Sequence, residues 1–61
     1  MLENYEDVMT VEETAEALRI GKNALYALLE NKHLRGYRNG RVWRIPKEAV
    51  IEYIRTQSHM A

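Results

Sequence analysis

The chain has 61 residues, which is one small domain near the lower size limit for folding without a disulfide or metal staple. It has no cysteine, which excludes disulfides and thiolate metal sites and fits a reducing compartment, and its 46% hydrophobic content suits a packed domain rather than a disordered tail. Nine basic and nine acidic residues give zero formal net charge.

Residues 1–8 are acidic and without periodicity, and we expect them to form a mobile arm. They lack the basic-then-apolar order of a signal peptide. The longest unbroken apolar run, Ala24–Leu29, is far too short to cross a membrane. These features predict a cytoplasmic protein without a membrane partner.

A short amphipathic helix is predicted over residues 11–18. Thr10 offers a hydroxyl N-cap and Glu13 follows three residues later, which is the spacing of a capping box. Apolar residues recur at helical spacing and acids occupy the other face. The predicted buried residues are Val11, Ala15 and Leu18.

Arg19-Ile20-Gly21 interrupts this pattern, and a second helix is predicted from about Lys22. Its buried stripe is Leu25, Leu28 and Leu29. The residues that fall on the opposite side are Lys22, Asn23, Tyr26 and Ala27. Two short helices joined by a few residues that include a glycine describe a helix-turn-helix, although the pattern alone matches any αα-hairpin.

A β-hairpin is predicted around Asn39-Gly40, because Asn-Gly is the preferred pair for a type I′ turn. Closure at that pair places Arg38 opposite Arg41 and Arg35 opposite Arg44. Like charges directly opposite each other cost a few tenths to about 1 kcal/mol per pair. Arginines that splay into solvent and protect an edge strand explain one such pair, whereas two pairs favour neutralisation by a polyanion. One face of this hairpin carries Leu34, Trp43 and Ile45, with Arg38 and Arg41 at its tip, and the other carries Arg35, Tyr37, Val42 and Arg44.

The zero net charge conceals a strong asymmetry along the chain. Residues 1–18 carry six acids and no base, whereas residues 19–61 carry nine bases and three acids. Six bases follow one another at a three-residue spacing with no acid between the first and the last. They are Lys32, Arg35, Arg38, Arg41, Arg44 and Lys47. A domain of this size cannot bury such a cluster, and a positive surface on a small protein suits nucleic acid, with a solvated face as the alternative.

A third helix is predicted from Pro46, since proline is favoured at the first helical position. Its apolar face consists of Val50, Tyr53 and Ile54, with Ile51 at the edge. Arg55 suits the C-terminal end of the helix dipole. Residues 57–61 are expected to be a frayed tail.

The order helix, glycine turn, helix, arginine-rich hairpin, helix is that of a compact winged helix-turn-helix. Three segments resemble the excisionase-family DNA-binding domain, a relative of the MerR-type winged helix. They are Met9–Leu18 (MTVEETAEAL), Ile20–Leu28 (IGKNALYAL) and Gly40–Pro46 (GRVWRIP). The resemblance spans residues 9–55. The chain departs from the family at Gly21, where a hydroxyl residue is common, and at Ala27, where a base is common.

The resemblance implies an α+β, mainly α fold: a small winged helix-turn-helix over residues 9–56, with a two-stranded antiparallel wing and a C-terminal helix. It implies a sequence-specific DNA-binding protein, most often an excisionase that binds near attachment sites and assists a tyrosine or serine integrase in excising a mobile element. Small winged-helix transcriptional regulators share the fold and are the alternative. A protein-interaction adaptor or antitoxin-like module is a further alternative function. These roles need neither catalysis nor a cofactor.

The resemblance also places the second helix in the major groove. Lys22 and Asn23 in its first turn then approach base edges, and Tyr26 reaches a phosphate or a thymine methyl group. The structural alternatives are that Asn23 supports the helix start and that Tyr26 covers the edge of the core. The two arginines at the wing tip enter the minor groove or grip the backbone, and the two further from the tip hold phosphates. The expected DNA-binding residues are Lys22, Asn23, Tyr26, Arg35, Arg38, Arg41 and Arg44.

Other candidate sites are weaker. Trp43 shares a face with apolar residues and is expected in the core rather than as a base-stacking platform. His33 is a lone histidine at a helix end, which favours a cap or surface role over metal binding. Ser58 is the only serine and no glycine-rich phosphate loop is present, so no enzyme active site is indicated.

A single recognition helix and wing cover few base pairs, and each apolar face is needed by the one core. We therefore expect a monomer in solution that binds adjacent DNA sites cooperatively. In that arrangement the acidic N-terminal part of one copy lies near the basic wing of the next.

Overall fold

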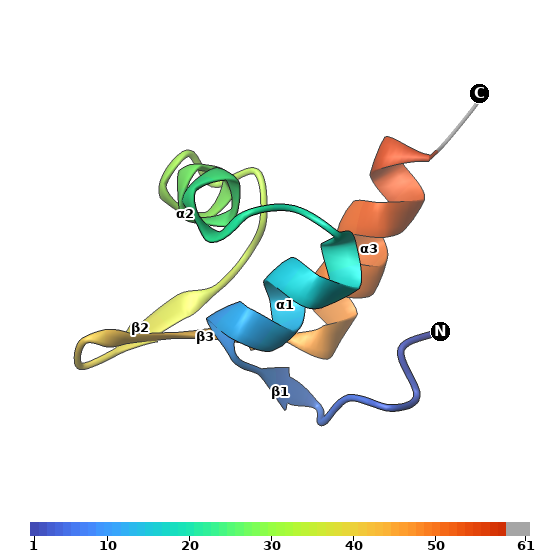
Figure 1. Ribbon diagram of the computed structural model, residues 1–61, viewed down its shortest axis with the longest axis horizontal. Coiled ribbons are helices and arrows are strands. Elements are labelled where there is room, and N and C mark those ends of the chain that lie inside the picture. Colours follow the sequence, from blue (N-terminus) through green and yellow to red (C-terminus); the bar gives the residue numbers. More distant parts are fainter. Residues whose placement is uncertain (59–61) are drawn as a thin grey trace.

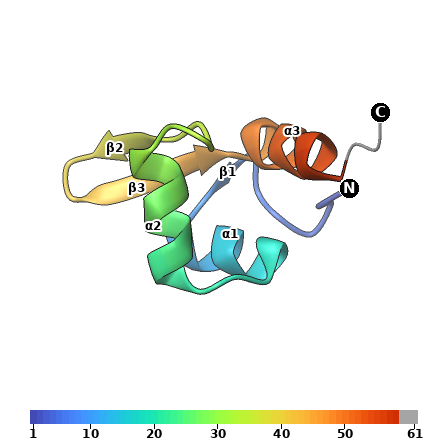
Figure 2. The ribbon, with the colours of Figure 1, turned by 90° about the horizontal axis from the view of Figure 1, so that it is seen from above.

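The structure is a computed structural model that describes residues 1–58, and in this part of the chain three helices pack beside a three-stranded antiparallel sheet (Figure 1). The elements in chain order are β1 (Val8–Met9), α1 (Val11–Leu18), α2 (Lys22–Glu30), β2 (Tyr37–Asn39), β3 (Val42–Pro46) and α3 (Lys47–Gln57). α1 packs against α2 and β3, and α3 packs against β3. The β2–β3 hairpin projects from the helices as a wing (Figures 1 and 2). The predicted winged helix-turn-helix is confirmed, with one strand more than expected.

Helix α1 begins and ends through local hydrogen bonds. The Glu13 N–H donates to Thr10 Oγ1 and the Thr10 N–H donates to Glu13 Oε1, each at 3.0 Å, so the predicted capping box is present. At the other end, the Arg19 N–H donates to the Glu16 carbonyl at 3.2 Å and the Ile20 N–H to the Ala15 carbonyl at 3.0 Å. This is the bond pattern of a Schellman motif, and it holds Arg19 in the left-handed region at φ 58°.

Helix α2 buries the stripe that its sequence predicts. Leu25 and Leu29 are buried and Leu28 is half-buried. Gly21 is the N-cap and supplies no side-chain hydrogen bond. The helix ends in a second Schellman motif, in which Lys32 adopts φ 63°.

The segment expected to be a mobile arm, residues 1–8, contributes a strand instead. β1 pairs with the end of β3, with Val8 opposite Pro46 and Met9 opposite Ile45, so β3 is the central strand of the sheet. Met9 is completely buried. Two strand residues are too few to show an alternating pattern, and their partners lie 36 to 38 positions further along the chain. For this reason the acidic composition of residues 1–8 did not indicate a strand.

Further contacts hold the residues before β1 against the body. The Lys47 N–H donates to the Asp7 carbonyl at 2.7 Å, and Lys47 Nζ donates to the Tyr5 carbonyl at 3.2 Å. The Tyr5 hydroxyl donates to Glu16 Oε1 at 3.0 Å, and this bond to a carboxylate raises the pKa of the phenol above its ordinary value. Leu2 and Tyr5 also pack against the core.

The hairpin turn lies one residue later than predicted, which moves the partner of each strand residue by two positions. The opposed pairs are Tyr37 with Arg44, Arg38 with Trp43, and Asn39 with Val42. The two loop residues are therefore Gly40 and Arg41, and of the two only Gly40 has a positive φ, at 70°. A positive φ at the first loop position alone fits a type II′ turn, in which glycine takes that position, rather than the type I′ turn that Asn-Gly favours. A shift of two keeps each residue on its predicted face and changes every opposed pair.

Tertiary packing explains this register. Gly36 lies where an added Cβ would be 2.8 Å from Leu29 Cδ2 and 3.2 Å from the Arg44 carbonyl oxygen, so the backbone before β2 runs directly beneath α2. Ile45 is completely buried and also pairs with β1. The C-terminal half of β3 is thus fixed by contacts with β1 and with the segment beneath α2.

Pro46 is the last residue of β3 and the N-cap of α3, with ψ 135°, so the helix begins one residue later than predicted. α3 then runs to Gln57, one residue into the expected frayed tail, and Ser58 caps it. The rest of that predicted tail, residues 59–61, lies outside the described residues. Within residues 1–58, no helix is long and apolar enough to cross a membrane.

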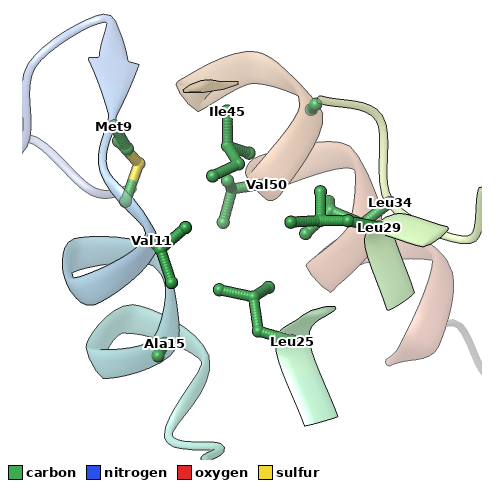
Figure 3. Close-up of a cluster of buried hydrophobic side chains, with 9 residues drawn as sticks. Met9, Val11, Ala15, Leu25, Leu29, Leu34, Ile45 and Val50 are labelled. Atoms are coloured by element: carbon green, nitrogen blue, oxygen red, sulfur yellow. The ribbon is translucent and has the colours of Figure 1, made fainter. Parts of the chain in front are cut away.

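One core joins these elements (Figure 3). Its buried hydrophobic residues are Met9, Val11, Ala15, Leu25, Leu29, Leu34, Ile45, Ala49 and Val50. Leu18, Leu28, Tyr53 and Ile54 were predicted to be buried and pack partly exposed around this cluster. All three helices direct their apolar face into the same core, which leaves the exposed sides of α2 and the wing for other contacts.

Candidate nucleic-acid interface

The exposed side of α2 carries the three residues expected to contact DNA from this helix. Lys22 and Asn23 are exposed in the first turn, and Tyr26 is 39% exposed one turn later. Their donors and the aromatic ring project from one side of a helix whose other side is buried, which is the arrangement of a recognition helix.

The wing lies on the same side of the molecule as α2. In Figure 1 both project to the left, while α3 and the N-terminus lie to the right, and Figure 2 shows the same separation from above. A surface that contacts α2 and the wing together is therefore available to one extended ligand. In helix-turn-helix proteins a recognition helix occupies the major groove, and an appendage beside it can reach the minor groove.

The two wing-tip arginines do not oppose each other. Arg38 lies opposite Trp43, and its guanidinium carbon is 5.8 Å from the centre of the indole ring, which is within cation–π range. Arg41 is an exposed loop residue of the turn. The prediction of an Arg38–Arg41 pair is wrong because the turn is formed by Gly40 and Arg41.

Arg35 and Arg44 are also not brought together. Arg35 precedes β2, and its Nη2 donates to Glu52 Oε1 of α3 at 3.0 Å. Arg44 is half-buried and lies opposite Tyr37, which is 50% exposed. The like-charge repulsion that favoured a polyanion is therefore absent from the wing. The case for an anionic ligand rests instead on the density of bases around α2 and the wing.

Three ion pairs link these bases to acids from other parts of the chain. Their members are Lys22 with Glu12 at 3.6 Å, Arg35 with Glu52 at 3.0 Å, and Lys47 with Asp7 at 3.8 Å. Two of the three acids come from the acidic N-terminal part, so part of the charge asymmetry is balanced within the molecule. The pairs of Lys22 and Arg35 are exposed, so each contributes at most about 1 kcal/mol and an anionic ligand can compete for these two bases.

Trp43 was expected in the core, but it is half-buried and packs against the core with part of its surface still accessible. His33 is exposed just after α2, and its N–H donates to the Leu28 carbonyl at 2.9 Å. Among residues 1–58 there is no group of three or more histidine, cysteine or acidic side chains that could hold a metal ion.

Lys32 is one of the six regularly spaced bases but was not among the expected DNA-binding residues. Lys32 lines a notch between the end of α2 and the wing, together with Arg35 and Trp43. Its place as the first of the six regularly spaced bases was a signal, but nothing in the sequence indicated its left-handed backbone. Together, α2 and the wing present exposed nitrogen donors, one side-chain amide and an aromatic ring. This set of groups is suited to binding an anionic polymer.

Comparison with known proteins agrees with this geometry. The helix-turn-helix domain family matches residues 8–58. A curated relative named probable excisionase, from Saccharopolyspora erythraea, is 39% identical over 46 residues, which are 75% of this chain and 47% of the relative. The chain thus spans about half the length of that relative, and no solved structure gives a significant match. The excisionase-type resemblance of the sequence is confirmed, and the chain belongs to this family of DNA-binding helix-turn-helix domains.

Proposed function

We propose that the chain binds double-stranded DNA sequence-specifically, with α2 in the major groove and the wing tip in the adjacent minor groove. In this role Lys22 and Asn23 contact base edges, because first-turn residues of a recognition helix reach them, and asparagine reads adenine in a bidentate way. Tyr26 contacts a phosphate or a thymine methyl group. Arg38 and Arg41 act in the minor groove or on its backbone, and Arg35 and Arg44 hold phosphates. The observation that supports the proposal is that α2, with Lys22, Asn23 and Tyr26 exposed, and the basic wing lie on one side of the molecule.

We further propose that this DNA binding serves excision of a mobile element. The support is the 39% identical relative whose name is probable excisionase, although the match covers about half of that protein. In this role the chain binds near the attachment sites and assists a tyrosine or serine integrase, and the chain itself performs no catalysis. A transcriptional regulator uses the same fold, so the fold does not separate the two roles.

On DNA we propose monomers that bind adjacent sites cooperatively. All three helices already use their apolar face in one core, which leaves none of these faces for a stable dimer. Some acids of α1 and of the residues before it are paired with bases of the same molecule. When DNA binds those basic side chains, the acids become available to the basic wing of a neighbouring copy.

Selection of duplexes from a random pool tests the DNA-binding proposal. An enriched sequence is expected, and binding to it should weaken with salt, with a slope of log K against log salt of about −5 if five or six bases meet phosphates. A slope near zero contradicts the proposal.

The excision role has a separate test. A plasmid with the two junctions of an element, its integrase and this protein should release the excised circle, and omission of the protein should reduce the yield. Unchanged excision together with repression of a promoter that carries the selected sequence indicates a transcriptional regulator instead.

A further inference from the structure

A notch of about 370 Å³ lies between the C-terminal end of α2 and the inner face of the wing, which is the face that carries Trp43. Its lining comes from α2, from the loop that follows it and from β3. The lining residues are Leu29, Lys32, Leu34, Arg35, Gly36 and Trp43. The notch therefore joins the two elements that the proposed function places in neighbouring grooves.

The chemistry of the notch differs between its floor and its rim. The floor is apolar, because it is formed by Leu29, Leu34 and the ring of Trp43. Leu29 and Leu34 are almost fully buried, whereas the Trp43 ring is only partly covered. The rim carries the exposed bases Lys32 and Arg35, and the guanidinium of Arg38 lies over the Trp43 ring. An apolar floor with cations along its edge matches a chain of sugars joined by phosphates.

The backbone of Lys32 supplies a second observation. Its left-handed conformation is one in which glycine is favoured and a side chain is disfavoured. A cation also suits the C-terminal end of a helix, and Arg19 occupies the equivalent position of α1. What distinguishes Lys32 from Arg19 is its place on the notch. Arg19 lies between Leu18 and Ile20, which line a pocket with Tyr53 and Ile54 of α3. The C-terminal end of α1 and α3 lie away from the wing (Figure 1).

We propose that this notch seats one sugar–phosphate strand of the DNA, with Lys32 and Arg35 on its phosphates and the Trp43 ring against a deoxyribose. The proposal rests on the proposed DNA binding. If α2 occupies the major groove and the wing the adjacent minor groove, the strand that separates the two grooves must pass between α2 and the wing, where the notch lies. Lys32 and Trp43 are then DNA-contacting residues beyond those on the exposed side of α2 and on the wing arginines.

Two matched variants test the proposal, Lys32→Gly and Arg19→Gly. Each removes one positive charge and places glycine at a left-handed position, so both are expected to keep or raise the thermal midpoint. Binding is measured on a short labelled duplex selected by the wild-type protein. Loss of one phosphate contact should lower the magnitude of the salt slope by about 0.9 in Lys32→Gly, which corresponds to about an eightfold lower affinity at 0.1 M salt. Arg19→Gly should keep the wild-type slope.

The fluorescence of Trp43, the single tryptophan of the chain, gives a second measurement. Saturation with the same duplex should change its intensity or emission wavelength, because the ring becomes covered. An equal effect of the two glycine variants, no effect of either, or an unchanged Trp43 emission at saturation overturns the notch assignment while DNA binding stands. A wild-type protein that selects no duplex overturns the function on which the assignment rests.

Discussion

The guanidinium of Arg35 donates to the carboxylate of Glu52 across the fold, with 3.0 Å between Nη2 and Oε1. Their side chains are 73% and 68% exposed, so solvent screens the pair and it contributes little to stability. If Arg35 binds a phosphate as proposed, that phosphate must displace Glu52, so an acid of α3 competes with the ligand for this base.

Glu52→Gln should strengthen DNA binding by at most about fivefold, since it removes a competitor worth roughly 0.2–1 kcal/mol. Fluorescence anisotropy on the selected duplex measures this change. Glu48→Gln is the matched control: it makes the same change in net charge on the same helix, and no ion pair involves Glu48 within residues 1–58. Equal increases in both variants would mean that only net charge matters.

Gly21→Ser should stabilise the domain. Gly21 is the N-cap of α2, has extended backbone angles and has open space where a Cβ would lie. A serine oxygen there can accept a hydrogen bond from the first turn, which is worth a few tenths of a kcal/mol over glycine. Thermal unfolding should show a midpoint higher by about 1–4 °C. Gly21→Ala adds a Cβ without the oxygen, and a gain of the same size in that variant would exclude capping as the cause.

Gly36→Ala should destabilise the domain by about 1–3 kcal/mol through overpacking. The added methyl group meets Leu29 Cδ2 at 2.8 Å and the Arg44 carbonyl oxygen at 3.2 Å, and a strand backbone cannot easily move away. Urea titration measures the loss. In a double-mutant cycle with Leu29→Ala, the combined cost should be smaller than the sum of the single costs, because the shortened side chain makes room. Additive costs would show that the clash with Leu29 is not the cause.

Arg41→Ala should weaken DNA binding and leave stability unchanged, because Arg41 is exposed in the turn of the wing. Arg38→Ala should weaken binding and also lower stability by about 0.5–1 kcal/mol, because it removes the contact with Trp43. Arg55→Ala removes the same charge from the last turn of α3, away from the wing, and serves as the control. An unchanged DNA affinity in Arg41→Ala would show that the wing tip does not contact the DNA.

Cooperative binding should appear in gel shifts on DNA with one, two and three copies of the selected sequence. Occupancy of adjacent sites should rise more steeply than that of a single site, and sedimentation without DNA should find a monomer. Moving two sites apart by half a helical turn is the control, since it separates neighbours on the duplex without changing the sites. Independent filling at the original spacing, or a tight dimer without DNA, is the contrary result.

The sequence by itself determined the helices and the faces they expose. Thr10 and Glu13 define the start of α1 through a bond pattern of four residues. The leucine spacing in α2 leaves Lys22 and Asn23 on the solvent side. Both signals act over one or two helical turns, so a short stretch of sequence contains all the residues that produce them.

Only the tertiary structure decided the sheet and the partners of the bases. The pairing of Val8 with Pro46, the packing of Gly36 beneath α2 and the Arg35–Glu52 ion pair each join residues that are distant in sequence. The turn sequence Asn-Gly-Arg allows closure at either of two positions, and the burial of Ile45 and the path of the chain at Gly36 select one of them. Long-range packing is stronger than a turn preference worth a fraction of a kcal/mol. For this reason the faces of the wing were predictable, whereas its opposed pairs and the notch beside α2 were not.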